Sequence, residues 1–281
     1  MLWIFPGQPL QYQPTAETDA ELLSLDELCR DRCGYSLIRH EALPGHTLSP
    51  QSCLQLSGVA TSLYQARRLR RERLAPQLVA EHSLGLYAAL ATCGCINEGD
   101  ALELAGRFGT CMARMGAAKS YALGCPTGLT CEKVESIARN NSVHVANYNT
   151  SRHFLLAGVL DRVEAAMEEC RNAGAFSVSC FPSEAPLHTP LMEEIAGELQ
   201  EIVKDISIKP PQIPLVEHIN QTRLAREDIS AFLVEELCRP VFWEKTWLAL
   251  RKTGFSRYFE VGSGQALSKL NRWIESEHTQ R

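Results

Sequence analysis

Val79-Ala80-Glu81-His82-Ser83-Leu84-Gly85 is the stretch of this 281-residue chain that decides its fold. The apolar residues at 76–80 indicate a short buried strand, and the Leu- and Ala-rich residues at 84–93 indicate a helix. Ser83 therefore stands on a tight strand-to-helix turn, which exposes the serine oxygen and offers it the backbone N–H groups of a helix start. The stretch departs from the pattern G-x-S-x-G because Glu81 replaces the first glycine. Taken alone, a serine here is equally typical of a nucleophile and of a helix N-cap.

Periodic apolar residues predict further elements on both sides of this turn. We expect a strand at 1–6 and helices at 18–33, opening at Thr18-Asp19, and at 50–74. Another helix is expected at 100–115, with Asp100 as its candidate cap. Beyond residue 182 the pattern predicts strands at 215–216 and 258–261. It predicts helices at 190–205, 226–237 and 243–253, and a last one that runs to about residue 274.

Residues 117–182 have a different order of elements. Strands are expected at 118–124, 143–147, 153–158 and 176–181, and helices at 130–139 and 160–172. This βαββαβ order suits a split ferredoxin-like sandwich. The sequence thus predicts an α/β fold, with a large domain formed by 1–116 and 183–281 and a ferredoxin-like insertion at 117–182.

Composition excludes several classes of protein. Apolar residues make up 45% and charged residues 22%, as in ordinary soluble domains, and the net charge of −5 argues against general nucleic-acid binding. The longest apolar runs are far short of the roughly 18 residues of a membrane span, and the first residues are expected to form a buried strand and no signal peptide. Eleven cysteines without a secretory signal indicate reduced thiols in the cytoplasm. No second ligand set accompanies the pairs Cys29/Cys33 and Cys93/Cys95, so no metal site is expected.

Six stretches, in order along nearly the whole chain, resemble the malonyl-CoA:acyl carrier protein transacylase family, which includes the acyltransferase domains of fatty-acid and polyketide synthases. They are FPGQPLQ (5–11), EHSLGLYAAL (81–90), VANYNT (145–150), APLHTPLM (185–192), RPVFW (239–243) and FEVGSG (259–264). The second is similar to the family's G-H-S-L-G-E-Y-A-A-L. The resemblance implies an α/β-hydrolase-like large domain with a ferredoxin-like small one, in agreement with the elements expected above.

The resemblance also implies a mechanism, ping-pong acyl transfer. Ser83 would attack the thioester of an acyl-CoA with His188 as the base, and the phosphopantetheine thiol of an acyl carrier protein would then take the acyl group. Glu236 would orient His188 through its side chain or its backbone carbonyl. The backbone N–H groups of Gln11 and Leu84 would form the oxyanion hole. No metal or bound cofactor is implied, and family members are often monomers.

The chain departs from malonyl-specific members at the residue that would pair with the substrate's carboxylate. These carry an arginine on the helix after the elbow, which pairs with the free carboxylate of the acyl group. Here that position is Phe108. Cys111 and Met112, three and four residues later, share its helix face and are also apolar, whereas Arg107 is turned by about 100°.

Other departures lie close to the nucleophile. Glu81 would repel an anionic acyl group if it were ionised, and would otherwise be protonated or bonded to a neighbour, because an unpaired buried carboxylate is costly. Leu86 replaces the family's glutamate after the elbow glycine, and Pro9 replaces a loop glycine. Together with Phe108, Met112 and Asn149, Glu81 is expected to contact the substrate.

These departures favour an acyl group without a free carboxylate, such as acetyl or a longer chain. Three alternatives stay open from the sequence. They are a malonyltransferase proper, in which Arg107 or Arg114 substitutes for the missing arginine, a hydrolase of acyl-carrier thioesters, and a non-catalytic scaffold that binds a carrier protein. Five arginines at the end of the 50–74 helix are either a docking patch for an acidic carrier or a solvated helix end. They are Arg67, Arg68, Arg70, Arg71 and Arg73.

Overall fold

A parallel four-stranded sheet forms the centre of the larger part of the molecule. The computed structural model describes residues 1–9, 11–12 and 19–279. The strand order is β10-β1-β4-β9, and every neighbouring pair is parallel. The strands are β1 (Leu2–Phe5), β4 (Leu78–Glu81), β9 (Leu215–Val216) and β10 (Tyr258–Glu260). Because the carboxyl ends of parallel strands meet at one edge of the sheet, β1 and β4 bring the loops that follow them together there.

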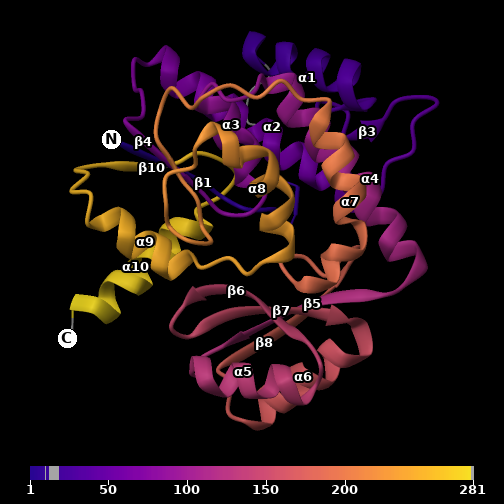
Figure 1. Cartoon of the computed structure of the whole chain (residues 1–281), viewed down its shortest axis with the longest axis vertical. Coiled ribbons are helices and arrows are strands. Elements are labelled where there is room, and N and C mark those ends of the chain that lie inside the picture. Colours follow the sequence, from indigo (N-terminus) through magenta and orange to yellow (C-terminus); the bar gives the residue numbers. More distant parts are fainter. Residues whose placement is uncertain (10, 13–18, 280–281) are drawn as a thin grey trace.

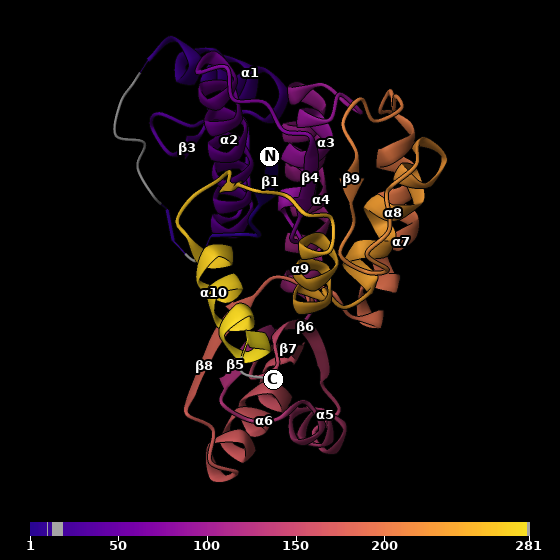
Figure 2. The same ribbon diagram turned by 90° about the vertical axis from the view of Figure 1, so that its left-hand side faces the viewer.

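Helices cover both faces of this sheet (Figures 1 and 2). On β1, Trp3 and Phe5 belong to one core cluster, whereas Leu2 and Ile4 belong to another, as the two-residue period of a strand requires. All four side chains are fully buried, which contributes roughly 1.5–3 kcal/mol each. The helices are α1 (Ala20–Cys33), α2 (Pro50–Arg71), α3 (Gly85–Thr92), α4 (Glu98–Ala118), α7 (Glu193–Lys204), α8 (Arg226–Cys238), α9 (Trp243–Arg251) and α10 (Ala266–Thr279). No helix in the described part of the chain is long and apolar enough to cross a membrane.

A second, antiparallel sheet has the order β6-β7-β5-β8 and a core cluster of its own. Its elements follow in the order expected from the sequence: β5 (Tyr121–Thr127), α5 (Cys131–Asn140), β6 (His144–Thr150), β7 (His153–Val159), α6 (Leu160–Asn172) and β8 (Ser177–Ser183). The two helices cover the face of this sheet that is turned away from the parallel sheet (Figures 1 and 2). The assignment of 117–182 as a domain of its own stays a prediction.

Two backbone hydrogen bonds join the antiparallel sheet to the part of the chain that carries the parallel sheet. Strand β6 pairs with the segment before α9, where the backbone N–H of Val241 donates to the carbonyl of Ala146 and the N–H of Tyr148 donates to the carbonyl of Val241. These bonds measure 2.9 and 2.8 Å. The end of β6 is thereby fixed beside the parallel sheet.

Several predicted boundaries are wrong by a few residues. The helix expected from residue 100 begins at Glu98, because Asn97 is its cap: the Asn97 Oδ1 accepts a hydrogen bond of 2.8 Å from the Asp100 N–H. The helix expected at 190–205 starts as a 3₁₀ turn, Pro190–Met192, which leads into α7. The short strands β2 (Tyr35–Ser36) and β3 (Glu41–Ala42) were not expected. The expected opening of the first helix at Thr18 falls outside the described residues, and Asp19 caps that helix.

Candidate active site

The turn after β4 is a strained elbow that presents Ser83. Its φ is +54°, a left-handed conformation that costs a residue with a side chain about 1 kcal/mol or more. Gly85 lies against the end of β1, where a Cβ atom on it would come within 2.3 Å of the Phe5 carbonyl oxygen. The elbow is therefore pressed onto the neighbouring strand, and only glycine fits at its third position.

Replacing Gly85 with alanine is expected to destabilise the protein by about 3 kcal/mol, because two backbone carbonyls must move to admit the methyl group. Gly197→Ala is the matched control. Gly197 lies inside α7 with open space around it, so the same change should stabilise the protein by about 0.5–1 kcal/mol. Urea unfolding of both variants measures the difference, and equal effects would contradict the close approach at Gly85.

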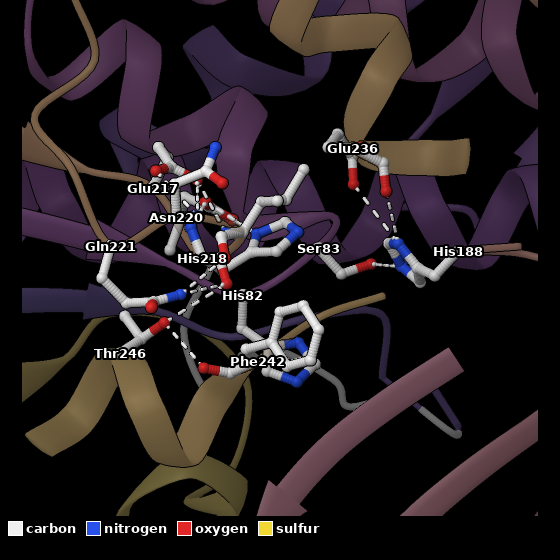
Figure 3. A network of polar contacts seen from close by, with 12 residues as sticks. His82, Ser83, His188, Glu217, His218, Asn220, Gln221, Glu236, Phe242 and Thr246 are labelled. Atoms are coloured by element: carbon white, nitrogen blue, oxygen red, sulfur yellow. Dashed lines mark hydrogen bonds and ion pairs between the residues drawn. The ribbon is translucent and has the colours of Figure 1, made fainter. Parts of the chain in front are cut away.

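A hydrogen-bonded chain joins Ser83, His188 and Glu236 (Figure 3). The Ser83 Oγ lies 2.7 Å from Nε2 of His188, and Nδ1 of the same ring lies 2.7 Å from the backbone carbonyl oxygen of Glu236. A carbonyl oxygen only accepts, so Nδ1 carries the ring proton and Nε2 is free to accept the proton of the serine. Of the two roles expected for Glu236, the geometry shows the backbone one. Its carboxylate Oε2 is 3.6 Å from Nδ1.

The environment of His188 keeps its ring neutral. Burial and the neighbouring His218 lower the pKa of His188 to about 3, and the hydrogen bond to the Glu236 carbonyl opposes this shift. The imidazole is thus in the form that accepts a proton throughout the neutral range. With Ser83 at 2.7 Å, this is the arrangement of a serine nucleophile and its general base.

A small cavity opens beside the Ser83 hydroxyl. Its volume is about 20 Å³, enough for one water-sized group. Apolar side chains form most of the wall, and Gln8, Gln55 and Glu236 line it in addition to the hydroxyl-bearing Ser83 and Tyr87. The lining residues are Gln8, Gln55, Ser83, Leu84, Tyr87, Ala105, Phe108, Met112, Leu187, Glu236 and Leu237. Phe108 meets the ring of Tyr87 edge to face, and Gln55 donates to the Gln8 Oε1 over 3.1 Å.

Comparison with known proteins identifies the chain's family. The family model for the acyl transferase domain matches residues 3–262, which is most of the chain. The chain belongs to the acyl transferase domain family. The resemblance seen in the six sequence stretches is thereby confirmed.

Individual proteins of this family are similar to the chain over different shares of their own length. The polyketide biosynthesis protein ThaF of Burkholderia thailandensis is 27% identical over 281 residues, which cover 97% of this chain and 24% of that protein. The chain thus spans about a quarter of that relative's length. The malonyl CoA-acyl carrier protein transacylase of Bacillus subtilis is 26% identical over 228 residues, or 78% of this chain and 72% of that one. A malonyl-transacylase solved in complex with a type II PKS acyl-carrier protein is 26% identical, with a TM-score of 0.89 over 98% of this chain and 93% of that one.

In this acyl transferase domain, neither arginine offered by the sequence as a partner for a substrate carboxylate faces the cavity. Arg107 pairs with Glu103 over 3.3 Å and with Asp205 over 2.8 Å. Arg114 pairs with Glu198, and both guanidinium groups are more than a third exposed. Phe108 and Met112, in contrast, line the cavity as expected from their shared helix face. Among the described residues, no lysine or arginine lines it.

Glu81, which was expected to contact the substrate, does not line the cavity beside Ser83. It is fully buried, and Nδ1 of His218 lies 2.8 and 2.9 Å from its two carboxylate oxygens. The backbone N–H of His218 donates to the same carboxylate over 3.2 Å. Of the states considered for Glu81, the structure shows the one bonded to a neighbour. Burial and the nearby Glu217 raise the pKa of Glu81, and the hydrogen bond from the His218 backbone opposes them.

His218 is the residue that sequence reasoning missed. It is fully buried within the segment that follows β9, 137 residues from Glu81. One signal for it was available. A glutamate buried in an apolar strand requires a buried hydrogen-bond partner, and few side chains in the sequence can serve as one.

Of the remaining predicted site residues, Leu84 lines the cavity, whereas Asn149 and Gln11 do not. Asn149 is buried on β6, where its Oδ1 lies 3.1 Å from Nε2 of His82, so it holds the ring beside the nucleophile. Gln11 is exposed and does not line the cavity, whereas Gln8 of the same loop does. Leu84 lines the cavity as the N-cap of α3, the position at which helix N–H groups lack partners within the helix.

The arginine-rich end of α2 fastens this helix to its neighbours. Arg67 pairs with Glu98 and Glu21, and Arg70 donates to the carbonyl of Thr92 over 2.6 Å. These two side chains are therefore occupied within the protein, which leaves less of the cluster for a carrier protein than the sequence suggested.

Proposed function

We propose that this acyl transferase domain moves a short acyl group without a free carboxylate from coenzyme A to the phosphopantetheine thiol of an acyl carrier protein. The observation that carries the proposal is the wall of the cavity beside Ser83, which contains Phe108 and Met112 and no cation among the described residues. The family supports the reaction class. The relatives named as malonyl-transacylases, one of them in complex with a carrier protein, support the acceptor.

The first half of the reaction forms an ester on Ser83. The hydroxyl oxygen attacks the thioester carbonyl as its proton moves to Nε2 of His188, 2.7 Å away. The resulting imidazolium keeps its hydrogen bond from Nδ1 to the Glu236 carbonyl. The tetrahedral oxyanion would be held by the backbone N–H of Leu84 at the start of α3 and by that of Gln8, which takes the place assigned to Gln11 from the sequence. His188 then returns its proton to the departing thiolate of coenzyme A.

The second half reverses these steps with a different thiol. The phosphopantetheine sulfur gives its proton to His188 and attacks the ester, and His188 then returns the proton to the departing oxygen of Ser83. No metal or bound cofactor takes part in this proposal.

The acyl group follows from the size and polarity of the cavity. A volume of about 20 Å³ accommodates the methyl group of an acetyl ester beside Ser83. A malonyl carboxylate would lose its hydration there without gaining a cationic partner, which is costly for an anion. An acetyl-sized group is thus the substrate that fits without rearrangement of Phe108.

Transfer to the carrier, and not to water, is the expected fate of the loaded enzyme. After loading with acetyl-CoA and removal of the excess, holo carrier protein should take up the acetyl group at least about tenfold faster than free acetate appears. Mass spectrometry of the carrier and detection of acetate measure the two routes, with apo carrier, which lacks the thiol, as the control. Rapid release of acetate without a thiol would identify a hydrolase, and failure of every acyl-CoA to load Ser83 would identify a non-catalytic scaffold.

A further inference from the structure

Behind the catalytic histidine lies a cluster of buried polar groups that the dyad does not use. In the described part of the chain, Nε2 of His218 and both carboxylate oxygens of Glu236 are buried without a hydrogen-bond partner. One side-chain nitrogen or oxygen from each of His188, His218 and Glu236 lies within 4.8 Å of the others. The rings of His188 and His218 meet edge to face at 6.1 Å. Unpartnered buried polar groups are costly, so their convergence at one place calls for an explanation.

The position of His218 is tightly fixed. Its Nδ1 and its backbone N–H both contact the carboxylate of Glu81, and its carbonyl accepts hydrogen bonds from Gln221 (3.0 Å) and from the backbone of Phe242 (3.2 Å). Phe232 packs against the ring at 5.8 Å. With Nδ1 turned to Glu81, the remaining nitrogen is on the side of the ring that faces Ser83 and Glu236 (Figure 3).

The protonation states make Glu236 a donor and His218 an acceptor. The Glu236 carboxyl is fully buried and neither of its oxygens has a hydrogen-bond partner, which favours its neutral, protonated form; burial and then the charge of Glu81 raise its pKa well above the usual value. Burial also raises the pKa of Glu81, but this carboxylate accepts hydrogen bonds from the backbone N–H and the Nδ1–H of His218, which favour its charged form. Burial lowers the pKa of His218 to about 4, so its ring is neutral. Because Nδ1–H is directed at the Glu81 carboxylate, the lone pair of His218 lies on Nε2. A gap of up to 4.8 Å is within reach of a single bridging water.

We propose that Glu236 and His218 form a proton relay behind His188, in which the carboxyl of Glu236 passes its proton to His218 as Ser83 passes its own to His188. The proton of Glu236 crosses to His218 through one bridging water. O–H bonds break at Ser83, at Glu236 and on the water, one O–H bond re-forms on the water, and two N–H bonds form, at His188 and at His218 Nε2. A carboxylate then lies beside the new imidazolium, and the Glu81 carboxylate stabilises the second one. When the leaving thiolate takes up the proton of His188, the proton on His218 returns through the water to Glu236. The relay rests on the proposed ester at Ser83 but not on the identity of the acyl group.

A double-mutant cycle tests the relay. His218→Asn keeps a side-chain N–H toward Glu81 and removes the acceptor at Nε2, and Glu236→Gln keeps the shape and the backbone carbonyl and removes the proton that moves. The readout is the rate at which a fluorophosphonate probe labels Ser83, which needs the same deprotonation but no acyl group. Each single variant should label about 10- to 100-fold more slowly, and the double variant within about twofold of the slower single one. For acyl transfer, kcat should fall while KM for the acyl-CoA stays the same.

A solvent isotope experiment gives a second readout that loss of packing alone would not change. In mixtures of H₂O and D₂O, the wild-type rate should depend on the cube of the deuterium fraction, because three protons move together, one of them through the bridging water. The rate of Glu236→Gln should depend on it linearly. Phe232→Leu is the matched control: it loosens the packing on His218 without changing a proton site, and should keep the cubic dependence.

Three results would overturn the relay: labelling of His218→Asn within twofold of wild type, losses that multiply in the double variant, or a linear dependence in the wild type. Should His218→Asn not fold, as judged by its melting temperature, the isotope readout on Glu236→Gln decides alone. Failure of the proposed function gives a different result from failure of the relay. The wild type would then react with the probe but accept no acyl group from any acyl-CoA.

Discussion

Replacing Ser83 with alanine is expected to lower acyl transfer by about four to six orders of magnitude, because no other group holds the acyl chain between the two thiols. In the proposed reaction the covalent step takes place on one atom: the Ser83 Oγ donates to Nε2 of His188 at 2.7 Å and lies at the start of α3. Without it, His188 has no proton to take.

The measurement is the rate of carrier acylation, together with the intact mass of the enzyme after incubation with acyl-CoA. Ser179→Ala, an exposed serine on β8, is the matched control and should keep wild-type activity and adduct. Ser83→Ala should remain folded, because alanine replaces serine in the same left-handed conformation without new contacts. An acyl adduct of normal yield on the folded Ser83→Ala variant would place the nucleophile elsewhere.

Introducing an arginine at Phe108 is expected to raise loading of malonyl relative to acetyl groups by about tenfold or more. A guanidinium at this position would project into the cavity and meet the free carboxylate with charge-assisted hydrogen bonds, each worth about 1.5–3 kcal/mol. The unliganded variant should be less stable than wild type, because Phe108 is almost fully buried and the new charge is unpaired until malonyl binds.

Competition between malonyl-CoA and acetyl-CoA measures this change, with Phe108→Leu as the control for loss of the aromatic ring. The leucine variant should keep the wild-type preference. A folded Phe108→Arg variant with an unchanged preference would show that the acyl group does not contact this part of α4.

Local sequence patterns predicted the elbow at Ser83 and part of the cavity wall. The elbow at Ser83 is recognisable because a strand, a tight turn and a helix follow one another within a few residues, and the fold presses Gly85 onto β1. Phe108 and Met112 line the cavity together because residues four apart share a face of α4, which periodicity alone determines. The histidine segment around His188 was found by resemblance, and its distance to Ser83 follows from the fold.

Contacts between distant segments could not be read in this way. Glu81 was expected to meet the substrate, but its partner His218 is 137 residues away, and only the pairing of β4 with β9 brings the two together. Likewise Gln8 and Gln11 are three residues apart in one loop, and the path of the backbone decides which of them faces the cavity. The sequence likewise does not show that Arg67 is paired, because its acidic partners Glu21 and Glu98 lie on other helices.

The central claim is that Ser83 accepts an acyl group without a free carboxylate. It is tested most directly by incubating the wild-type protein with equimolar acetyl-CoA and malonyl-CoA and determining the intact mass of the adduct on Ser83 within the first turnover. The account predicts an acetyl ester as the main adduct, because the cavity wall at Phe108 offers no partner to a second carboxylate. A malonyl ester that forms first and predominates would contradict it.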